Sequence, residues 1–318
     1  MNKILLLVLL LAASPHAFSQ VPINVQVQIL KAEDARRYDK TLEGLMRSPN
    51  VDVRTRAALA AGRIGNDAAI PALATLLKTD ASEKARAMAA FAVGEIESVK
   101  GADVILRAIG ETARAQMPGD VGGVDRGRLV EAAGKIAAAN AKDPKAKDLG
   151  QSILFTLEAE LLKGGQQSKE TIRLALTAAL RARPAGGEEI VRKFLAYTDP
   201  NIVADALNTL ARLKAKNANR DARDLLATHV HAVVRANAAR VLGAADDKEA
   251  LDVLLKAATT DVDSRVRVSA IRSLGALKDP KAADKLLEHG ETLLKQMSTD
   301  PVVLRLLRRP VPAGKPVR

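Results

Sequence analysis

Cysteine and tryptophan are absent from this chain of 318 residues, and aromatic side chains make up only 2% of it. The absence of cysteine excludes disulfide bonds, so the stability of the fold must come from packing alone. With so few rings, the 47% of residues that are hydrophobic are mainly Ala, Leu, Val and Ile. Small side chains of this kind suit many thin helix–helix contacts better than one thick core. No strand-like run of β-branched and aromatic residues occurs, and we predict an all-α protein.

Residues that carry catalysis or bind metals are also scarce. Only four histidines occur, and His229 and His231 would point to opposite sides of a helix. There is no Gly-x-Ser-x-Gly motif, and the Gly-Gly pairs precede no Gly-Lys-Ser/Thr. Ser168 is predicted to be a helix N-cap rather than a nucleophile. We therefore expect no catalytic residue, no cofactor and no metal site, and not an enzyme.

Features of nucleic-acid binding are weak. The tyrosines at 38 and 197 are isolated and offer no platform on which bases could stack. The net charge is +12, but five basic residues and no acidic residue lie between 301 and 318. The rest of the chain is therefore only mildly basic, and we expect no nucleic-acid partner.

The N-terminus has the pattern of a secretory signal. Lys3 precedes ten apolar residues, 4–13, and small residues stand at Ala17 and Ser19. This pattern predicts a signal peptide over residues 1–19, cleaved after Ser19. The apolar run is shorter than the roughly 20 residues that span a membrane, although an uncleaved anchor is the alternative. We expect an exported protein, periplasmic or secreted, with no transmembrane span in the mature chain.

What the chain does contain is a repeat of fixed length. Residues 234–255 recur 32 residues later, at 266–287, with the same Val-Arg, Ala, Leu-Gly and Leu-Leu positions. Val, Ala and Leu fall at i, i+4 and i+8, which places one apolar stripe on a first helix. The Leu-Leu pair lies on a second helix after a short turn. A period of this size is typical of stacked two-helix units.

Counting one arginine position per unit predicts about seven units. These positions are 54, 86, 126, 170, 203, 235 and 267. The spacing widens between 86 and 170, and Pro/Gly-rich loops make the period irregular over about 110–190. We predict an α-solenoid of about seven stacked two-helix repeats with terminal caps.

The predicted boundaries follow from this period. After the signal peptide, residues 20–47 form an N-terminal segment and capping helix, with 21–31 extended or irregular and a helix from Ala32 to Arg47. Residues 48–297 form the solenoid. Residues 298–318 form a short amphipathic helix and a basic, disordered tail.

In the units at 234–255 and 266–287, the Val-Arg at the start of the first helix and the Leu-Gly near its end resemble the HEAT repeat, in the short form also seen in bilin lyases. This resemblance implies an α-solenoid that binds macromolecules, and does not by itself imply an enzyme. Residues 29–40, 48–50 and 56–65 are similar to the N-terminal HEAT region of exported bacterial cyclophilin-type peptidyl-prolyl isomerases. That similarity implies the repeat half of such a system without its catalytic half.

In HEAT proteins such arginines pair with aspartates to form a ladder between neighbouring units. The resemblance implies that role here for Arg54, Arg86, Arg126, Arg235 and Arg267, with the nearby Asp52, Asp80, Asp125 and Asp263 as the acidic partners. An anion-binding stripe is the alternative. The ladder is favoured because the arginines occur in phase with core residues.

The tail has two interpretations. Asp300 and Pro301 are typical of a helix start, and Arg305, Arg308 and Arg309 share one face of the predicted helix. The helix is either a cap whose apolar face covers the last repeat or a basic arm that makes a weak contact with an anionic surface.

Three hypotheses for function follow. The first is an exported, non-catalytic scaffold that binds protein partners. The second is the repeat region of a peptidyl-prolyl isomerase system that lacks its catalytic domain. The third is a bilin-lyase-like or nucleic-acid-binding HEAT protein.

Overall fold

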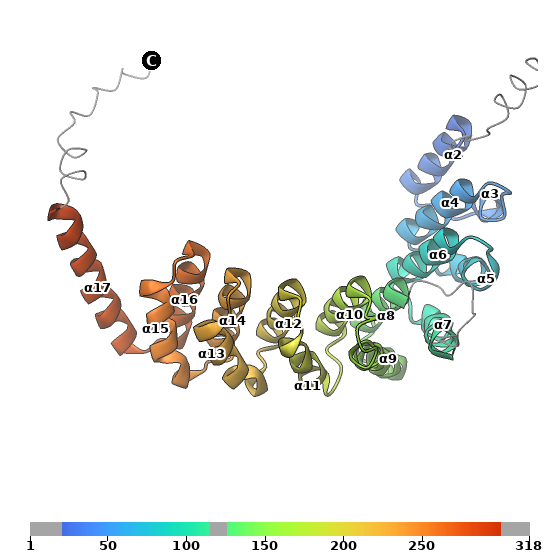
Figure 1. Cartoon of the computed structure of the whole chain (residues 1–318). Helices are drawn as coiled ribbons and strands as arrows, with labels where there is room; N and C mark the ends of the chain where they lie inside the picture. The colour runs from blue at the N-terminus through green and yellow to red at the C-terminus, as the bar shows by residue number, and fades with distance from the viewer. Residues whose placement is uncertain (1–20, 115–125, 300–318) are drawn as a thin grey trace, which may run out of the picture. The chain divides into compact units, whose positions relative to one another are not determined.

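The computed structural model describes residues 21–114 and 126–299 (Figure 1). Within these residues it contains sixteen α-helices, five short 3-10 helices and no strand. The all-α prediction is confirmed. None of the helices in these two stretches is both long and apolar enough to cross a membrane.

The chain divides into two compact bodies, Met1–Ala185 and Gly186–Arg318. The helices of the N-terminal body are α2 (Ile23–Asp34), α3 (Lys40–Leu45), α4 (Val51–Ile64), α5 (Ile70–Thr79), α6 (Glu83–Ile96), α7 (Ala102–Arg114), α8 (Arg126–Ala139), α9 (Pro144–Leu161) and α10 (Lys169–Ala182). Those of the C-terminal body are α11 (Gly187–Arg192), α12 (Pro200–Leu213), α13 (Asn219–Thr228), α14 (Ala232–Ala244), α15 (Leu251–Thr260), α16 (Ser264–Leu277) and α17 (Pro280–Thr299).

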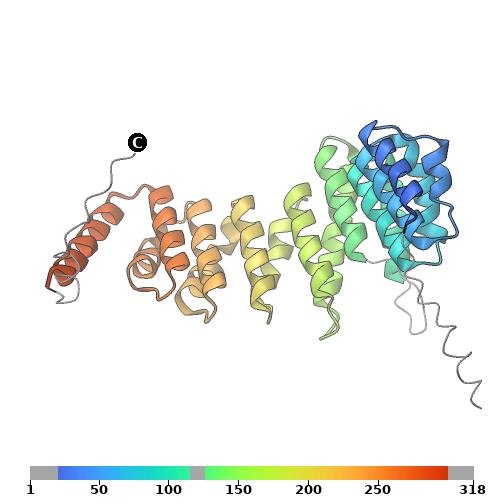
Figure 2. The same ribbon diagram turned by 90° about the horizontal axis from the view of Figure 1, so that it is seen from above.

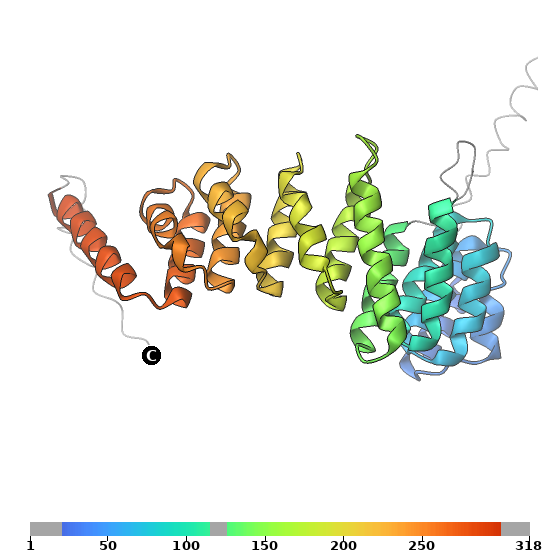
Figure 3. The ribbon, with the colours of Figure 1, turned by 90° about the horizontal axis from the view of Figure 1, so that it is seen from below.

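Both bodies are built by the same stacking rule. First helices pack side by side, α4 with α6, α8 and α10 in order, and α12 with α14 and α16 (Figure 2). Second helices pack against the first helix of the following repeat, as α5 does on α6 and α15 on α16 (Figure 3). Each repeat therefore completes the core of its neighbour, and the two-helix solenoid predicted from the period is confirmed.

Polar side chains fix where the first helices begin. The side chains of Asn50, Ser168, Asp199 and Asp263 accept hydrogen bonds from backbone N–H groups in the first turn of α4, α10, α12 and α16. These groups have no partner inside the helix, so a side-chain acceptor satisfies them. Ser168 is thus the predicted N-cap.

Small residues set the distance between first helices. A Cβ at Gly94 would lie 2.7 Å from the Cα of Ala132, and one at Gly134 would lie 2.7 Å from the Cα of Ala178. Only glycine lets the backbones approach this closely. In the third repeat, the alanine that meets this glycine, Ala132, lies six residues after the arginine position, Arg126. In the fourth repeat the corresponding alanine is Ala178, so the arginine position is residue 172 and not 170 as predicted. Residue 172 is a buried isoleucine.

The prediction for the N-terminal segment was wrong. Residues expected to be extended form α2, and the helix expected from Ala32 to Arg47 is interrupted after Asp34. Ile29 and Ala32 are buried one turn apart, and α2 packs on α4. This tertiary packing outweighs the weak alternation of the sequence. Arg36 then takes a left-handed conformation with φ 47°, which ends the helix.

Candidate protein-binding surface

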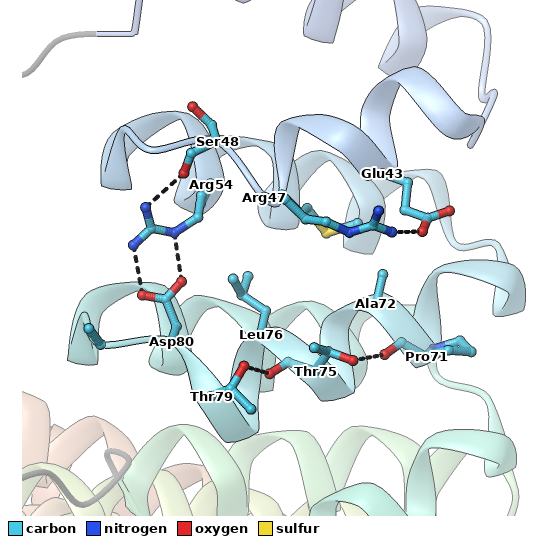
Figure 4. Close-up of a pocket in the computed structure, with 12 residues that line it drawn as sticks. Glu43, Arg47, Ser48, Arg54, Pro71, Ala72, Thr75, Leu76, Thr79 and Asp80 are labelled. Carbon is cyan, nitrogen blue, oxygen red and sulfur yellow. Dashed lines mark hydrogen bonds and ion pairs between the residues drawn. The ribbon is translucent and has the colours of Figure 1, made fainter.

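An arginine on α4 joins three segments of the first full repeat. Arg54 donates from Nε and Nη2 to the two carboxylate oxygens of Asp80, at 2.6 and 2.8 Å (Figure 4). Its Nη1 donates to the carbonyl oxygens of Ser48 and Pro49, at 2.9 and 3.1 Å. The Asp80 side chain is only 4% exposed. The guanidinium therefore ties the start of α4 to the end of α5 by charge-assisted hydrogen bonds.

The next repeat extends this arrangement. Arg86 donates from Nη1 to the carbonyl oxygens of Asp80 and Ala81, at 2.7 and 3.2 Å. Asp80 thus accepts from Arg54 at its side chain and from Arg86 at its backbone. One aspartate links the arginines of two successive repeats.

The C-terminal body contains the same motif. Arg235 binds both carboxylate oxygens of Asp261, at 2.7 and 2.9 Å. Arg267 donates to the carbonyl oxygens of Asp261 and Val262, at 2.7 and 3.2 Å. We call each of these Arg–Asp–Arg sets, 54–80–86 and 235–261–267, a ladder rung.

Of the four aspartates proposed from the sequence, Asp80 lies in a rung, Asp52 and Asp263 lie elsewhere, and Asp125 is outside the described residues. Asp52 accepts from Lys84 of the next repeat at 2.7 Å. Asp263 caps α16 and pairs with Arg265. Both residues stand in the first turn of a helix or just before it, where a carboxylate meets backbone N–H groups and neighbouring cations. The aspartates of the rungs end second helices and follow their arginine by 26 residues.

Arg126 makes a different contact. Its Nη2 donates to the carbonyl oxygen of Thr112 at 2.8 Å. Burial lowers the pKa of its guanidinium below the ordinary value. Three further arginines proposed as partner contacts, Arg305, Arg308 and Arg309, lie outside the described residues.

One repeat has lost both halves of the rung. Val203 occupies the arginine position and is buried, and His229, 26 residues later, occupies the aspartate position. His229 Nδ1 accepts the backbone N–H of His231 at 3.1 Å, as Asp80 Oδ1 accepts that of Ser82 at 2.8 Å. His229 therefore keeps the turn of the lost aspartate without its ion pair.

The two histidines thus lie in the turn between α13 and α14 rather than on one helix, with ring centroids 5.7 Å apart. No group of three His, Asp or Glu side chains able to hold a metal occurs in the described stretches. Absence of a metal site remains a prediction.

The rung carboxylates are held in their charged form. Hydrogen bonds from Arg54 hold the pKa of Asp80 below its ordinary value of 3.8. Hydrogen bonds from Arg235 do the same to the pKa of Asp261. The aspartates also raise the pKa of both arginines. The rungs are therefore fully ionised at neutral pH.

A groove of about 500 Å³ lies over the first rung, between α3 and α5. Figure 4 shows Arg54 and Asp80 at one end, with an ion pair between Arg47 and Glu43 across from α5. The α5 side of the groove is lined by Pro71, Ala72, Thr75, Leu76 and Thr79.

A matching groove of about 280 Å³ lies between α13 and α15, with Arg235 and Asp261 in its wall. Its α15 side is lined by Val253, Lys256, Ala257 and Thr260. These residues hold the same places on α15 as Ala72, Thr75, Leu76 and Thr79 hold on α5, counted from the rung aspartate. The groove is thus a property of the repeat, and we call the surface that carries it the second-helix surface.

Between α11 and α13 a third hollow, of about 360 Å³, is more highly charged. Glu189, Arg192, Lys193, Asp221 and Asp224 line it. Arg192 binds Asp221 at 2.6 Å. From α11 to α15 the second-helix surface therefore changes from strongly charged to mixed apolar and polar.

The stacking rule and the rungs define an α-solenoid of two-helix repeats. A family model described as HEAT repeats matches residues 38–116 and 219–293. The chain therefore carries HEAT repeats in these two stretches, one in each body. The similarity to cyclophilin-type isomerases proposed from the sequence remains a prediction.

Similarity to other known proteins is low. No match was found among the curated proteins. The complex of CpcE and CpcF of phycocyanin lyase from Nostoc sp. PCC7120 is 18% identical, with 78% of this chain and 87% of that chain covered and a TM-score of 0.39. Human deoxyhypusine hydroxylase in complex with glycerol is 17% identical, with coverages of 82% and 92% and a TM-score of 0.35. An engineered protein is 21% identical, with coverages of 75% and 95% and a TM-score of 0.32.

Proposed function

We propose that this protein is an exported, non-catalytic HEAT-repeat scaffold that binds a protein partner along its second-helix surface. The observation that carries the proposal is the recurrence of one groove, in equivalent positions over equivalent rungs, in both bodies. Each body therefore offers a groove of the same construction, to which a segment of a partner can bind.

The chemistry of the grooves supports a polypeptide ligand. They combine apolar groups, such as Leu76 and Val253, with hydroxyls and a cation, such as Thr75 and Lys256. They are open to solvent rather than enclosed, whereas small-molecule sites bury most of their ligand. A helix or an extended segment of a partner can lie in such an open, mixed groove.

Rigidity supports the same function. The rung under each groove consists of side chains that are largely buried, with Arg54 16% and Asp80 4% exposed. A groove whose wall is fixed in this way loses little conformational freedom when a partner binds.

Export is supported by the signal-like residues 1–19, and the sequence of the mature N-terminus, expected to begin at Gln20, tests it.

Site-specific photo-crosslinking tests the binding surface. A photoreactive amino acid replaces Thr75 or Lys256 in the two grooves, or Thr177 or Asn208 on the exposed side of first helices α10 and α12. After irradiation in intact cells, we expect the same partner band from both groove positions and none from the controls. A partner captured equally from the first-helix positions, or from no position, would contradict the proposal.

A further inference from the structure

The last first helix of the C-terminal body, α16, has no following first helix of the kind that packs on α12 and α14. On α14, Ala239 is fully buried, and a Cβ at Gly243 would meet Ser273 of α16 at 2.6 Å. The residues 32 positions later, on α16, are Ile271 and Gly275. Ile271 is 45% exposed, and a Cβ at Gly275 meets no described atom within 4 Å.

The last second helix is exposed on the matching side. On α15, Leu255 and Ala258 are buried, and α15 packs against α16. Their counterparts on α17 are Leu287, which is 67% exposed, and Gly290, whose Cβ would meet no described atom within 4 Å. Val268 of α16 is also 45% exposed, whereas Ala236, 32 residues earlier on α14, is buried. These residues of α16 and α17 thus hold the positions that a following repeat covers on α14 and α15. We call Val268, Ile271, Leu287 and Gly290 the terminal face.

We propose that residues 301–309 of the same chain occupy the terminal face as a final helix. Asp300 and Pro301 supply an N-cap and a first helical residue at the end of α17. Val302, Val303, Leu306 and Leu307 then share one side of the segment. At about 1.5 Å per residue, residues 301–309 span ~14 Å, the same distance that separates Gly290 from the end of α17. A helix that turns back at Asp300 therefore ends beside Gly290.

Charge favours this occupant over a second copy of the chain. Asp284 and Glu291 are exposed at i and i+7 along α17, next to the apolar residues of the terminal face. The segment carries Arg305, Arg308 and Arg309 on the side away from its leucines. With its apolar side on Leu287 and Gly290, the segment keeps its arginines in solvent, and their long side chains can reach back to the acidic residues beside the face. The terminal face of a second copy would instead bring two sets of these acidic residues together.

A chemical crosslink tests this placement in the full chain. Because the protein has no cysteine, the pair Gly290→Cys and Leu306→Cys can be joined by a short bis-maleimide without background. The matched control pair is Asn208→Cys and Leu306→Cys, since Asn208 is exposed on α12, two repeats before α16. We expect an intrachain crosslink, found by mass spectrometry of the monomer band, to be several-fold more frequent for the Gly290 pair.

A second variant provides an independent measurement. In the full chain, Leu306→Glu together with Leu307→Glu should speed backbone hydrogen exchange in α17, whereas Val317→Glu should leave it unchanged. Crosslinks that join two chains would assign the face to a second copy and overturn the proposal. Equal crosslinking of both pairs, or tail binding to anionic vesicles without an intrachain crosslink, would also overturn it.

Discussion

Single arginines hold this fold in register. Arg54 uses three of its nitrogens at once, two on Asp80 and one on the carbonyls before its own helix. The rung differs from a surface ion pair because both side chains are largely buried, so neither solvent nor salt can readily replace the partner. Arginine suits the position because its planar fork matches a carboxylate. The paired loss at Val203 and His229 agrees with this account, since an aspartate without its arginine would be a poorly compensated charge.

Removing a rung aspartate should destabilise its body. We expect Asp80→Ala to lower the free energy of unfolding by about 3 kcal/mol, because it leaves the Arg54 guanidinium partly buried without its carboxylate. His229→Ala, at the same position of a repeat without the arginine, is the matched control and should be nearly neutral. Urea denaturation followed by circular dichroism measures both. Similar losses for the two variants would show that the turn, and not the ion pair, contributes the stability.

The same rung predicts a pH dependence. The folded pKa of Asp80 lies below its ordinary value of 3.8, so its contribution is complete at neutral pH and is lost as the pH falls below about 4, through the folded pKa. The difference in unfolding free energy between the native chain and Asp80→Ala should therefore be constant from pH 7 to 5 and shrink towards pH 3. A difference that stays constant or grows on acidification would contradict the assigned protonation state.

Helices stack here through small residues at fixed places, and the sequence predicted most of this. The 32-residue period located the first and second helices of the regular repeats because one apolar stripe recurs in each. It failed for α2, whose alternating residues 23–29 resemble a strand until Ile29 is placed against α4. The sequence analysis also missed Asp261 as the partner of Arg235. These residues are 26 positions apart, and only the length of the second helix shows that this separation brings them together. The grooves could not be predicted, since they depend on the spacing between second helices.

Equivalent glycines provide a test of the stacking rule. Gly243→Val should cost about 1–3 kcal/mol or more, because its Cβ would lie 2.6 Å from the Cβ of Ser273 and the helices must move apart. Gly275→Val is the control at the same repeat position, with no described atom within 4 Å of its Cβ. It should change stability by less than about 0.5 kcal/mol. Thermal unfolding of both variants measures the difference, and equal losses would contradict the stacking rule.

At the scale of the whole molecule, the interruption of the period has a structural counterpart. The solenoid predicted as one stretch over 48–297 divides into two bodies between Ala185 and Gly186. The boundary falls in the Pro/Gly-rich loop at which the sequence period was predicted to be irregular. Gly186 has φ 79° there, a conformation that favours glycine. Each body nevertheless keeps one rung and one groove, so each can contribute its own contact to a partner.

Affinity for the captured partner, measured by isothermal titration calorimetry, tests the central claim most directly. The account predicts that Thr75→Glu and Lys256→Glu, in grooves of different bodies, each weaken binding at least about tenfold, which corresponds to ~1.4 kcal/mol. Thr177→Glu, on the exposed side of α10, should bind like the native chain. Unchanged affinity for both groove variants, or an equal loss for Thr177→Glu, would contradict binding along the second-helix surface.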